Sequence, residues 1–257
     1  MHPVLFSAGG LEIRTYGFIV AIAFLTGFYL MYAEAKRRNL FPDRVLDIEF
    51  IMLIAGVLGS RALHVLANLG YYMERPVKIL FLWEGGLAVH GGIIAGAAAT
   101  WIYIRLKKLP EREMADLIIP YVALGQSIGR IGCFFNGCCY GAETSEPALG
   151  FVFQGESVYR LPAQLYASAA LLVIFIILRS MSGRSPFPGF IFTLYLFLYG
   201  LERFMIDFFR GDLDRVFLSL TLTQAFSLGL MLASVFFYIW LSGKKAKNGK
   251  ARIHGNG

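Results

Sequence analysis

VFLSLTLTQAFSLGLMLASVFFYIWLSG, residues 216–243, is a run of 28 residues without a charged side chain. A helix needs about 20 apolar residues to cross the roughly 30 Å of hydrocarbon in a lipid bilayer. The run is therefore long enough to span a membrane. Hydrophobic residues make up 57% of the whole chain, which is above the share typical of soluble domains. Both observations indicate a membrane protein.

Six further apolar runs precede this one. Two of these runs, 16–33 and 161–178, have no charged residue. A third run, 85–104, has one histidine and no Asp, Glu, Lys or Arg. The other three runs include charged residues and cover 46–67, 114–132 and 187–209. The pattern predicts an all-α, polytopic membrane protein with about seven transmembrane helices in a single domain, residues 1–243. The first run has no basic segment before it and no small-residue cleavage site after it, so we expect an anchor rather than a removed signal peptide.

The positions of the basic residues predict the orientation. Lysine and arginine are enriched in the cytoplasmic connections of membrane proteins, so the amino terminus should be periplasmic and the carboxyl terminus cytoplasmic. Residues 133–160 then form the longest outer connection, and residues 244–257 a basic, disordered cytoplasmic tail. We interpret the net charge of +7 as a topology signal that favours anionic lipid, not as a nucleic-acid surface. The cytoplasmic set holds 15 of the 24 basic residues: Lys36, Arg37, Arg38, Arg44, Arg105, Lys107, Lys108, Arg112, Arg179, Arg184, Lys244, Lys245, Lys247, Lys250 and Arg252.

This orientation places most of the unusual polar residues in the outer half of the membrane. Arginines from at least three spans share that depth with few carboxylates, which favours binding of an anion. Guanidinium groups match phosphate geometry, and phospholipid headgroups are the abundant phosphates there. A transporter would need polar groups through the inner half, where the sequence shows few. The outer group consists of Tyr16, Arg61, His64, His90, Arg130, Tyr199, Arg203, Asp207 and Arg210.

Each of these residues also has an ordinary interpretation. Arg203 and Asp207 are four residues apart and could form a helix-stabilising pair. Tyr16 and Tyr199 could belong to the aromatic belt of the membrane interface, and His64 could be a packing residue. His90 lies between two glycine pairs, which could serve helix packing or let a ligand approach an imidazole that takes a proton near neutral pH.

Five motifs in order resemble those of the bacterial prolipoprotein diacylglyceryl transferases. The likeness covers nearly the whole chain, and the order of the motifs makes it specific. The motifs are IRTYG at 13–17, GGLAVHGG at 85–92, GRIGCFFNGCCYG at 129–141, LPAQLY at 161–166 and YGLERFMIDFFR at 199–210.

The resemblance implies transfer of a diacylglyceryl group from phosphatidylglycerol to the lipobox cysteine thiol of a prolipoprotein signal peptide. A thioether forms and glycerol phosphate leaves, in the bacterial inner membrane and without a metal or other cofactor. His90 and Arg203 would be catalytic, with His90 as the base for a thiol whose ordinary pKa is about 8.5. The residues implied to bind or shape the substrates are Tyr16, Arg130, Asn136, Gly141, Tyr199 and Asp207, with Arg130 and Arg203 on the phosphate.

The chain departs from the family signature Gly-Arg-x-Gly-Asn-Phe-x-Asn-x-Glu-x-x-Gly at two positions. Cys133 replaces the asparagine and Cys138 the glutamate, while Asp207 stands where a glutamate is usual. The roles of the two replaced residues do not transfer to thiols. Two rival functions therefore stay open: a related phospholipid-binding membrane protein without transferase activity, and an anion or lipid transporter.

The chain has three cysteines, and all of them lie in this segment. On the outer side an oxidising compartment allows a disulfide of Cys133 with Cys138 or Cys139. Free apolar thiols, a metal site and a transient covalent carrier are the alternatives. We expect a disulfide or free structural thiols, because three closely spaced cysteines lack a fixed fourth ligand for a metal.

Overall fold

The described chain divides into two compact units in the computed structural model. One unit comprises Met1–Leu30 with Ala115–Gly257, and the other is Met31–Met114. The structure describes residues 4–8, 11–82, 85–153, 157–210, 215–217 and 220–254. The expectation of a single membrane domain stays a prediction.

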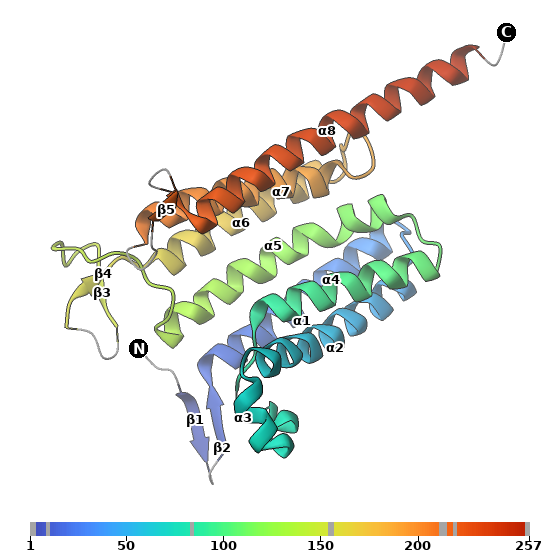
Figure 1. Ribbon diagram of the computed structural model, residues 1–257. Helices are drawn as coiled ribbons and strands as arrows, with labels where there is room; N and C mark the ends of the chain where they lie inside the picture. The colour runs from blue at the N-terminus through green and yellow to red at the C-terminus, as the bar shows by residue number, and fades with distance from the viewer. Residues whose placement is uncertain are drawn as a thin grey trace. The chain divides into compact units, whose positions relative to one another are not determined.

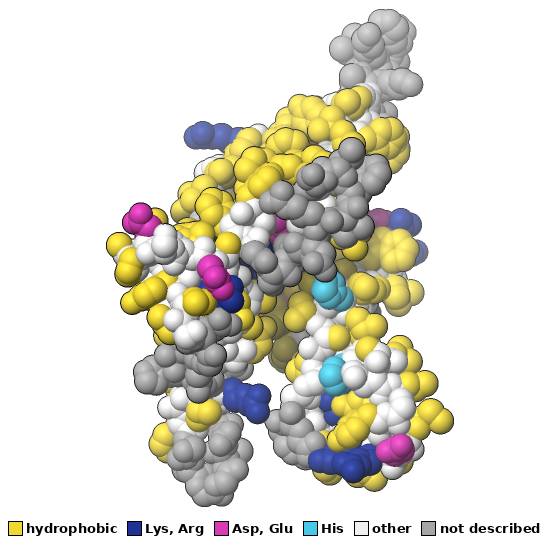
Figure 2. All heavy atoms as spheres, turned by 60° about the vertical axis from the view of Figure 1, so that its left-hand side comes forward, with side chains coloured by type: hydrophobic (Ala, Val, Ile, Leu, Met, Phe, Trp, Pro, Cys, Tyr) yellow, Lys and Arg dark blue, Asp and Glu magenta, His cyan; other side chains and the backbone are white. Residues whose placement is uncertain are grey.

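Most of the described residues are helical (Figure 1). Five helices are long and apolar enough to cross a membrane. Large hydrophobic side chains are exposed along them, and Figure 2 shows such side chains over much of the visible helical surface; lipid would cover this surface in a membrane. The chain is therefore a multi-pass membrane protein. The five helices are α1 (Thr15–Arg37), α2 (Pro42–Ala67), α5 (Glu111–Asn136), α6 (Ala163–Met181) and α8 (Leu222–His254).

Two further helices occupy the other predicted runs. Helix α4 (Val89–Leu106) lies in run 85–104, and α7 (Phe190–Ile206) lies in run 187–209. The number of seven spans and the orientation of the termini stay predictions.

Helices α5, α6 and α7 of the first unit share one apolar core. Leu171 of α6 and Ile191 of α7 are each 1% exposed, and Ala123 of α5 is fully buried with them. Hydroxyl groups join α5 to α6. Ser127 Oγ donates to the Ser168 carbonyl at 2.8 Å, and Ser168 Oγ donates to the Ser127 carbonyl at 2.9 Å. These bonds satisfy polar groups that would be costly to leave unpaired among apolar side chains.

A carboxylate caps the start of α7. The Asp116 side chain of α5 accepts hydrogen bonds from the backbone N–H groups of Gly189, at 2.7 Å, and Phe192, at 2.9 Å. The first N–H groups of a helix lack partners within it, and the helix dipole favours negative charge there. Asp116 thus fixes the register of α7 against α5, and with it the position of the polar residues further along α7.

The second unit is built on close packing of α2 against α4, joined by α3 (Leu69–Glu74) and η1 (Pro76–Leu80). A Cβ atom added to Gly59 would lie 2.2 Å from Ala95 Cβ and 2.6 Å from the Gly91 carbonyl oxygen. The two helices therefore approach at a distance that only glycine permits at this crossing, as small residues allow in membrane helix pairs.

Gly59→Ala is expected to destabilise the protein by about 1–3 kcal/mol, because the added methyl group overpacks the α2–α4 contact. The measurement is the thermal unfolding midpoint of the purified protein in detergent. Gly229→Ala is the matched control, since a Cβ there meets no atom within 4 Å and alanine favours a helix interior over glycine by about 1 kcal/mol. Equal midpoints for the two variants would contradict the prediction.

Within the described part of the chain, three two-stranded antiparallel sheets lie outside the main helices, and the all-α prediction did not include them. They pair β1 (Val4–Ala8) with β2 (Leu11–Arg14), β3 (Phe151–Val152) with β4 (Tyr159–Arg160), and β5 (Arg215–Phe217) with β6 (Leu220–Thr221). A short 3-10 helix, η3 (Asp207–Phe209), follows α7. Backbone pairing in short connections leaves little periodic pattern in the sequence, which is why these pairs were not predicted.

The backbone of α8 continues as a helix to His254, whereas the sequence analysis expected disorder from residue 244. Residues 255–257 of that expected tail lie outside the described residues.

Candidate functional site

The end of α5 folds the cysteine-rich segment back onto the helix. Gly137 has a φ of +71°, which glycine adopts without strain. Its N–H group bonds to the Phe134 carbonyl at 3.1 Å, and the Cys138 N–H group bonds to the Cys133 carbonyl at 3.2 Å. These two bonds are the Schellman pattern of helix termination. The termination places Cys138 beside Cys133, five residues earlier.

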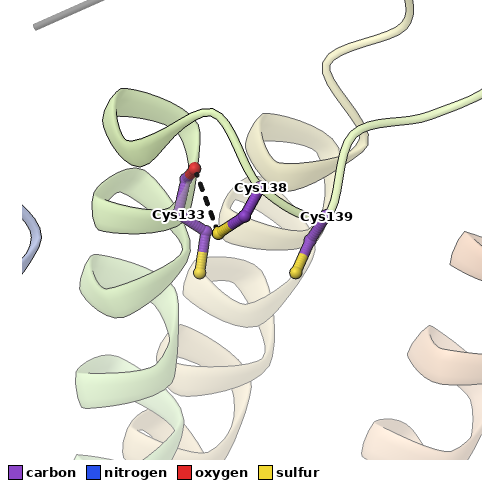
Figure 3. Close-up of side chains that lie close together, drawn as sticks. All are labelled: Cys133, Cys138 and Cys139. Carbon is purple, nitrogen blue, oxygen red and sulfur yellow. Dashed lines mark hydrogen bonds between the residues drawn. The ribbon is translucent and has the colours of Figure 1, made fainter. Parts of the chain in front are cut away.

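The three thiols gather at this point (Figure 3). The Sγ atoms of Cys133, Cys138 and Cys139 all lie within 4.8 Å of one another, and the side chains are half-buried. All three cysteines are free. The Asn136 amide donates to Cys138 Sγ at 3.6 Å, and Gln164 Nε2 donates to the Cys138 carbonyl at 2.7 Å. The segment is thus held from α5 and from α6.

The neighbouring thiols and two arginines act on the Cys139 thiol. Hydrogen bonds from the Cys133 and Cys138 thiols, followed by the charges of Arg130 and Arg210, hold the pKa of the Cys139 thiol below its usual range. Its φ of +61° is a left-handed conformation that costs energy for a residue with a side chain. With this backbone conformation, the Cys139 sulfur lies within 4.8 Å of the other two.

Tyr16 joins the same site from α1. Gly132 of α5 is buried under it, since a Cβ there would lie 3.2 Å from Tyr16 Cδ2. The tyrosine interacts electrostatically with Arg130 and with each of the three thiols. The amino-terminal motif and the cysteine segment are therefore neighbours in space, although more than a hundred residues separate them in the chain.

Arg130 is half-buried in α5, three residues before Cys133. Among the described residues it makes no hydrogen bond or ion pair within contact distance. It interacts electrostatically with Tyr199 and with Glu202 of α7. The guanidinium therefore has no competing hydrogen-bond partner among the described residues, and its binding of a phosphate stays a prediction.

Arg203, in contrast, has a fixed partner. Its Nη2 donates to Asp207 Oδ1 at 3.2 Å, and Thr221 Oγ1 donates to Asp207 Oδ2 at 3.0 Å. Asp207 is fully buried and Arg203 is 12% exposed. The sequence analysis left open a helix-stabilising pair of Arg203 with Asp207, and the structure contains this pair. Asp207 compensates the charge of Arg203 and fixes the direction of its guanidinium.

Asp207→Ala is expected to destabilise the protein by about 3–5 kcal/mol, because it leaves a largely buried Arg203 charge unpaired. Thr221→Val should cost less, since it removes one hydrogen bond to a charged group, about 1.5–3 kcal/mol. Unfolding midpoints in detergent measure both effects. Asp43→Ala on the exposed start of α2 is the control and should change little. A midpoint for Asp207→Ala equal to that of this control would show that the pair is not a structural requirement.

Gly141 belongs to the site through its backbone. Its N–H group donates to the Leu161 carbonyl at 2.8 Å, and the next N–H group, of Ala142, donates to the Phe209 carbonyl at 2.8 Å. A Cβ on Gly141 would lie 2.6 Å from that same Phe209 oxygen. Glycine is therefore required for the close approach between this loop and η3.

His90 lies in the second unit, in the exposed first turn of α4. The segment before it is fixed by the fold: the Ala88 N–H group bonds to the Ser60 carbonyl at 3.0 Å. Arg61 Nη1 donates to the carbonyls of Gly85, at 2.7 Å, and Gly86, at 3.1 Å. The imidazole is thus presented on a backbone segment held by α2.

Arg61 is not a free cation for an anionic ligand, contrary to the sequence analysis. The side chain is 6% exposed and stacks over the Tyr72 ring at 5.2 Å. His64 also packs here, with its ring edge-on to Tyr72. The guanidinium donates to five backbone carbonyl groups: Lys78, Ile79, Phe81, Gly85 and Gly86. Arg61 therefore positions the segment that carries His90.

Sequence reasoning assigned no role to two buried polar residues of the first unit. Glu202 is 5% exposed, and neither of its carboxylate oxygens has a hydrogen-bond partner among the described residues. Gln164 is 1% exposed and holds the Cys138 carbonyl. Both residues lie within the motifs quoted above, and this position was the one signal in the sequence that could have pointed to them. Their burial could not be predicted from the sequence.

The structure thus brings together most of the predicted site. Seven of the predicted residues belong to the first unit: Tyr16, Arg130, Asn136, Gly141, Tyr199, Arg203 and Asp207. Electrostatic interactions or hydrogen bonds connect all of these except Gly141, through Arg130, the thiols and Asp207. Gly141 lies in the loop that continues from this cluster. His90 belongs to the other unit.

Several long, apolar helices define the class of this protein, which is a multi-pass integral membrane protein with a polar site at the end of α5. Comparison with known proteins gives the family. The chain matches the family model described as prolipoprotein diacylglyceryl transferase over residues 3–240. This protein belongs to the prolipoprotein diacylglyceryl transferase family.

Similar curated proteins carry the name phosphatidylglycerol–prolipoprotein diacylglyceryl transferase. The Geobacter sulfurreducens relative is 36% identical over 250 residues, covering 94% of this chain and 94% of the relative. The Clostridium tetani relative is 32% identical over 243 residues, covering 93% of this chain and 97% of the relative. The Lactobacillus acidophilus relative is 31% identical over 268 residues, covering 100% of this chain and 95% of the relative. The similarity extends over essentially the whole chain in each case.

Proposed function

We propose that this protein transfers the diacylglyceryl group of phosphatidylglycerol to the lipobox cysteine thiol of prolipoprotein signal peptides. A carbon–sulfur bond forms at the glyceryl carbon, and the bond from that carbon to the phosphate oxygen breaks. The thiol proton goes to His90, and glycerol phosphate leaves with the electron pair of the broken bond. The reaction takes place at the outer side of the bacterial inner membrane. The protein crosses this membrane seven times, with its amino terminus in the periplasm.

One observation carries the assignment of the site: Arg130 is half-buried beside Tyr16 and Tyr199 without a contacting carboxylate among the described residues. A guanidinium in such surroundings can form two parallel hydrogen bonds with a phosphate. It can also stabilise the charge that develops on the departing phosphate. Arg203, directed by Asp207, is the second donor to the same group.

The remaining residues shape the space around the phosphate. The Tyr199 ring stacks on Tyr195 with centroids 5.5 Å apart, and the Tyr195 hydroxyl donates to Gln126 at 2.8 Å. Tyr199 therefore has a fixed ring plane beside Arg203. Asn136 stands exposed at the end of α5, where its amide can reach a headgroup or a peptide backbone.

The test is a reconstituted reaction with the purified full chain, phosphatidylglycerol and a synthetic lipobox peptide. Mass spectrometry of the peptide should show a gain of one diacylglyceryl unit. A peptide with serine in place of the lipobox cysteine is the control and should gain no mass. Phosphatidylglycerol binding without product would favour the inactive lipid-binding rival, and ion or lipid uptake into proteoliposomes without product would favour a transporter.

A further inference from the structure

We propose that Cys133, Cys138 and Cys139 form a Zn²⁺ site with three protein ligands and one open coordination position. The proposal depends on the positions of the three thiols and not on the transferase reaction. It revises the expectation from the sequence that these cysteines form a disulfide or remain free structural thiols.

The separation of the sulfur atoms fits a metal. A zinc–sulfur bond is about 2.3 Å long, so tetrahedral coordination places the sulfurs about 3.8 Å apart. The three Sγ atoms already lie within 4.8 Å of one another and are presented from the last turn of α5 and the loop after it (Figure 3). Shifts of about 1 Å or less, within reach of small side-chain rotations, bring them to that separation. The thiols are half-buried, so an ion can enter.

The surrounding fold fixes these positions before any metal binds. The helix termination at Gly137 sets Cys138 beside Cys133, and Gln164 of α6 holds the Cys138 carbonyl at 2.7 Å. The Asn136 amide donates to Cys138 Sγ at 3.6 Å, as outer hydrogen bonds do toward the ligands of metal sites. A disulfide would use two of the thiols and leave the third unexplained, whereas a metal uses all three.

The surrounding charge also favours the site. Three thiolates and Zn²⁺ carry a net charge of −1, and two positively charged residues, Arg130 and Arg210, act electrostatically on Cys139. Sulfur ligands select Zn²⁺ and Cu⁺ over Mg²⁺ and Ca²⁺. The group contains no fourth histidine, cysteine or carboxylate among the described residues. Three protein ligands with a free position is the arrangement of zinc sites that bind an external ligand, whereas purely structural zinc sites have four.

Metal binding by the purified, reduced full chain in detergent tests the proposal. After removal of metal with a chelator, titration with Co²⁺ should saturate at about one ion per chain. A sulfur-to-cobalt charge-transfer absorption should appear and then disappear as Zn²⁺ displaces the cobalt. Elemental analysis after dialysis against Zn²⁺ should also give about one zinc per chain.

Variants separate a built site from adventitious binding. Cys138→Ser keeps nearly the same volume and should weaken Co²⁺ binding at least tenfold, with loss of charge-transfer intensity. Asn136→Ala should weaken it by about 10–100-fold, the usual effect of losing an outer hydrogen bond to a metal ligand. Ser182→Ala, in the loop after α6, is the control and should bind as wild type. Unfolding midpoints of the metal-free variants show whether each one folds.

Three outcomes would overturn the proposal. The first is a reduced wild-type chain that binds no Co²⁺ or Zn²⁺. The second is unchanged affinity in folded Cys138→Ser. The third is a disulfide between two of the cysteines, found by alkylation and mass spectrometry in protein freshly isolated from membranes, that leaves no zinc bound. Each result is independent of the lipidation assay, so failure of this site and failure of the transferase function are distinguishable.

Discussion

Replacing Arg130 with alanine is expected to lower the lipidation rate by about 10²–10³-fold, the usual cost of losing one donor that stabilises a developing negative charge. The guanidinium is half-buried at the end of α5 and has no contacting carboxylate among the described residues. Its removal therefore takes away a phosphate donor without leaving a buried partner unpaired. The measurement is kcat/KM in the reconstituted assay, with thermal unfolding to confirm that the variant folds.

Arg130→Lys separates charge from geometry. Lysine keeps the positive charge but cannot form two parallel hydrogen bonds with one phosphate, so an intermediate loss is expected. Arg179→Ala is the matched control, because Arg179 lies 15 residues beyond Gln164 in α6, about 22 Å along the helix. Activity of Arg130→Ala within twofold of this control would remove Arg130 from the phosphate site.

His90→Ala is expected to lower kcat by about 10²–10⁴-fold, the contribution typical of a general base. KM for phosphatidylglycerol should change little, because the imidazole is assigned to the thiol proton and not to the phosphate.

Val89→Ala is the control for His90, since Val89 is its exposed neighbour in the first turn of α4. It should keep near-normal turnover. His90→Gln should be as impaired as His90→Ala, because an amide keeps the polarity but cannot accept the proton. Near-normal turnover in His90→Ala would show that another group takes the thiol proton, and would leave the assignment of Arg130 untouched.

The helices could be predicted because the length of an apolar run is a local property of the chain. Run 16–33 became α1, and run 161–178 became most of α6. The glycines that allow α2 and α4 to pack closely, Gly59 and Gly91, could not be paired in advance, since they are 32 residues apart and belong to different helices. The short sheets were missed for a different reason, since their paired strands are close in sequence but carry no strong alternating pattern.

The candidate site was predicted in its membership but not in its interactions. The ordered motifs named Arg130, Arg203 and His90, and comparison with known proteins then gave the family. Burial decides what those charges do, and burial depends on neighbours from other helices. Glu202 shows the difference: it is adjacent to Arg203 in sequence, but only packing makes it a nearly inaccessible carboxylate without a hydrogen-bond partner among the described residues.

The membrane class, the helices and the set of motifs could be predicted from the amino-acid sequence alone, because hydrophobic run length and residue order need no information about distant contacts. The interactions of the individual arginines became known from the folded structure. Arg61 is satisfied by backbone carbonyls, Arg203 by Asp207, and Arg130 makes no contact of this kind with the described residues. The approach of three sulfurs at the end of α5 is likewise tertiary, because a helix termination and a glutamine from α6 fix it. Burial and the contacts made by other elements decide these interactions, and folding sets both.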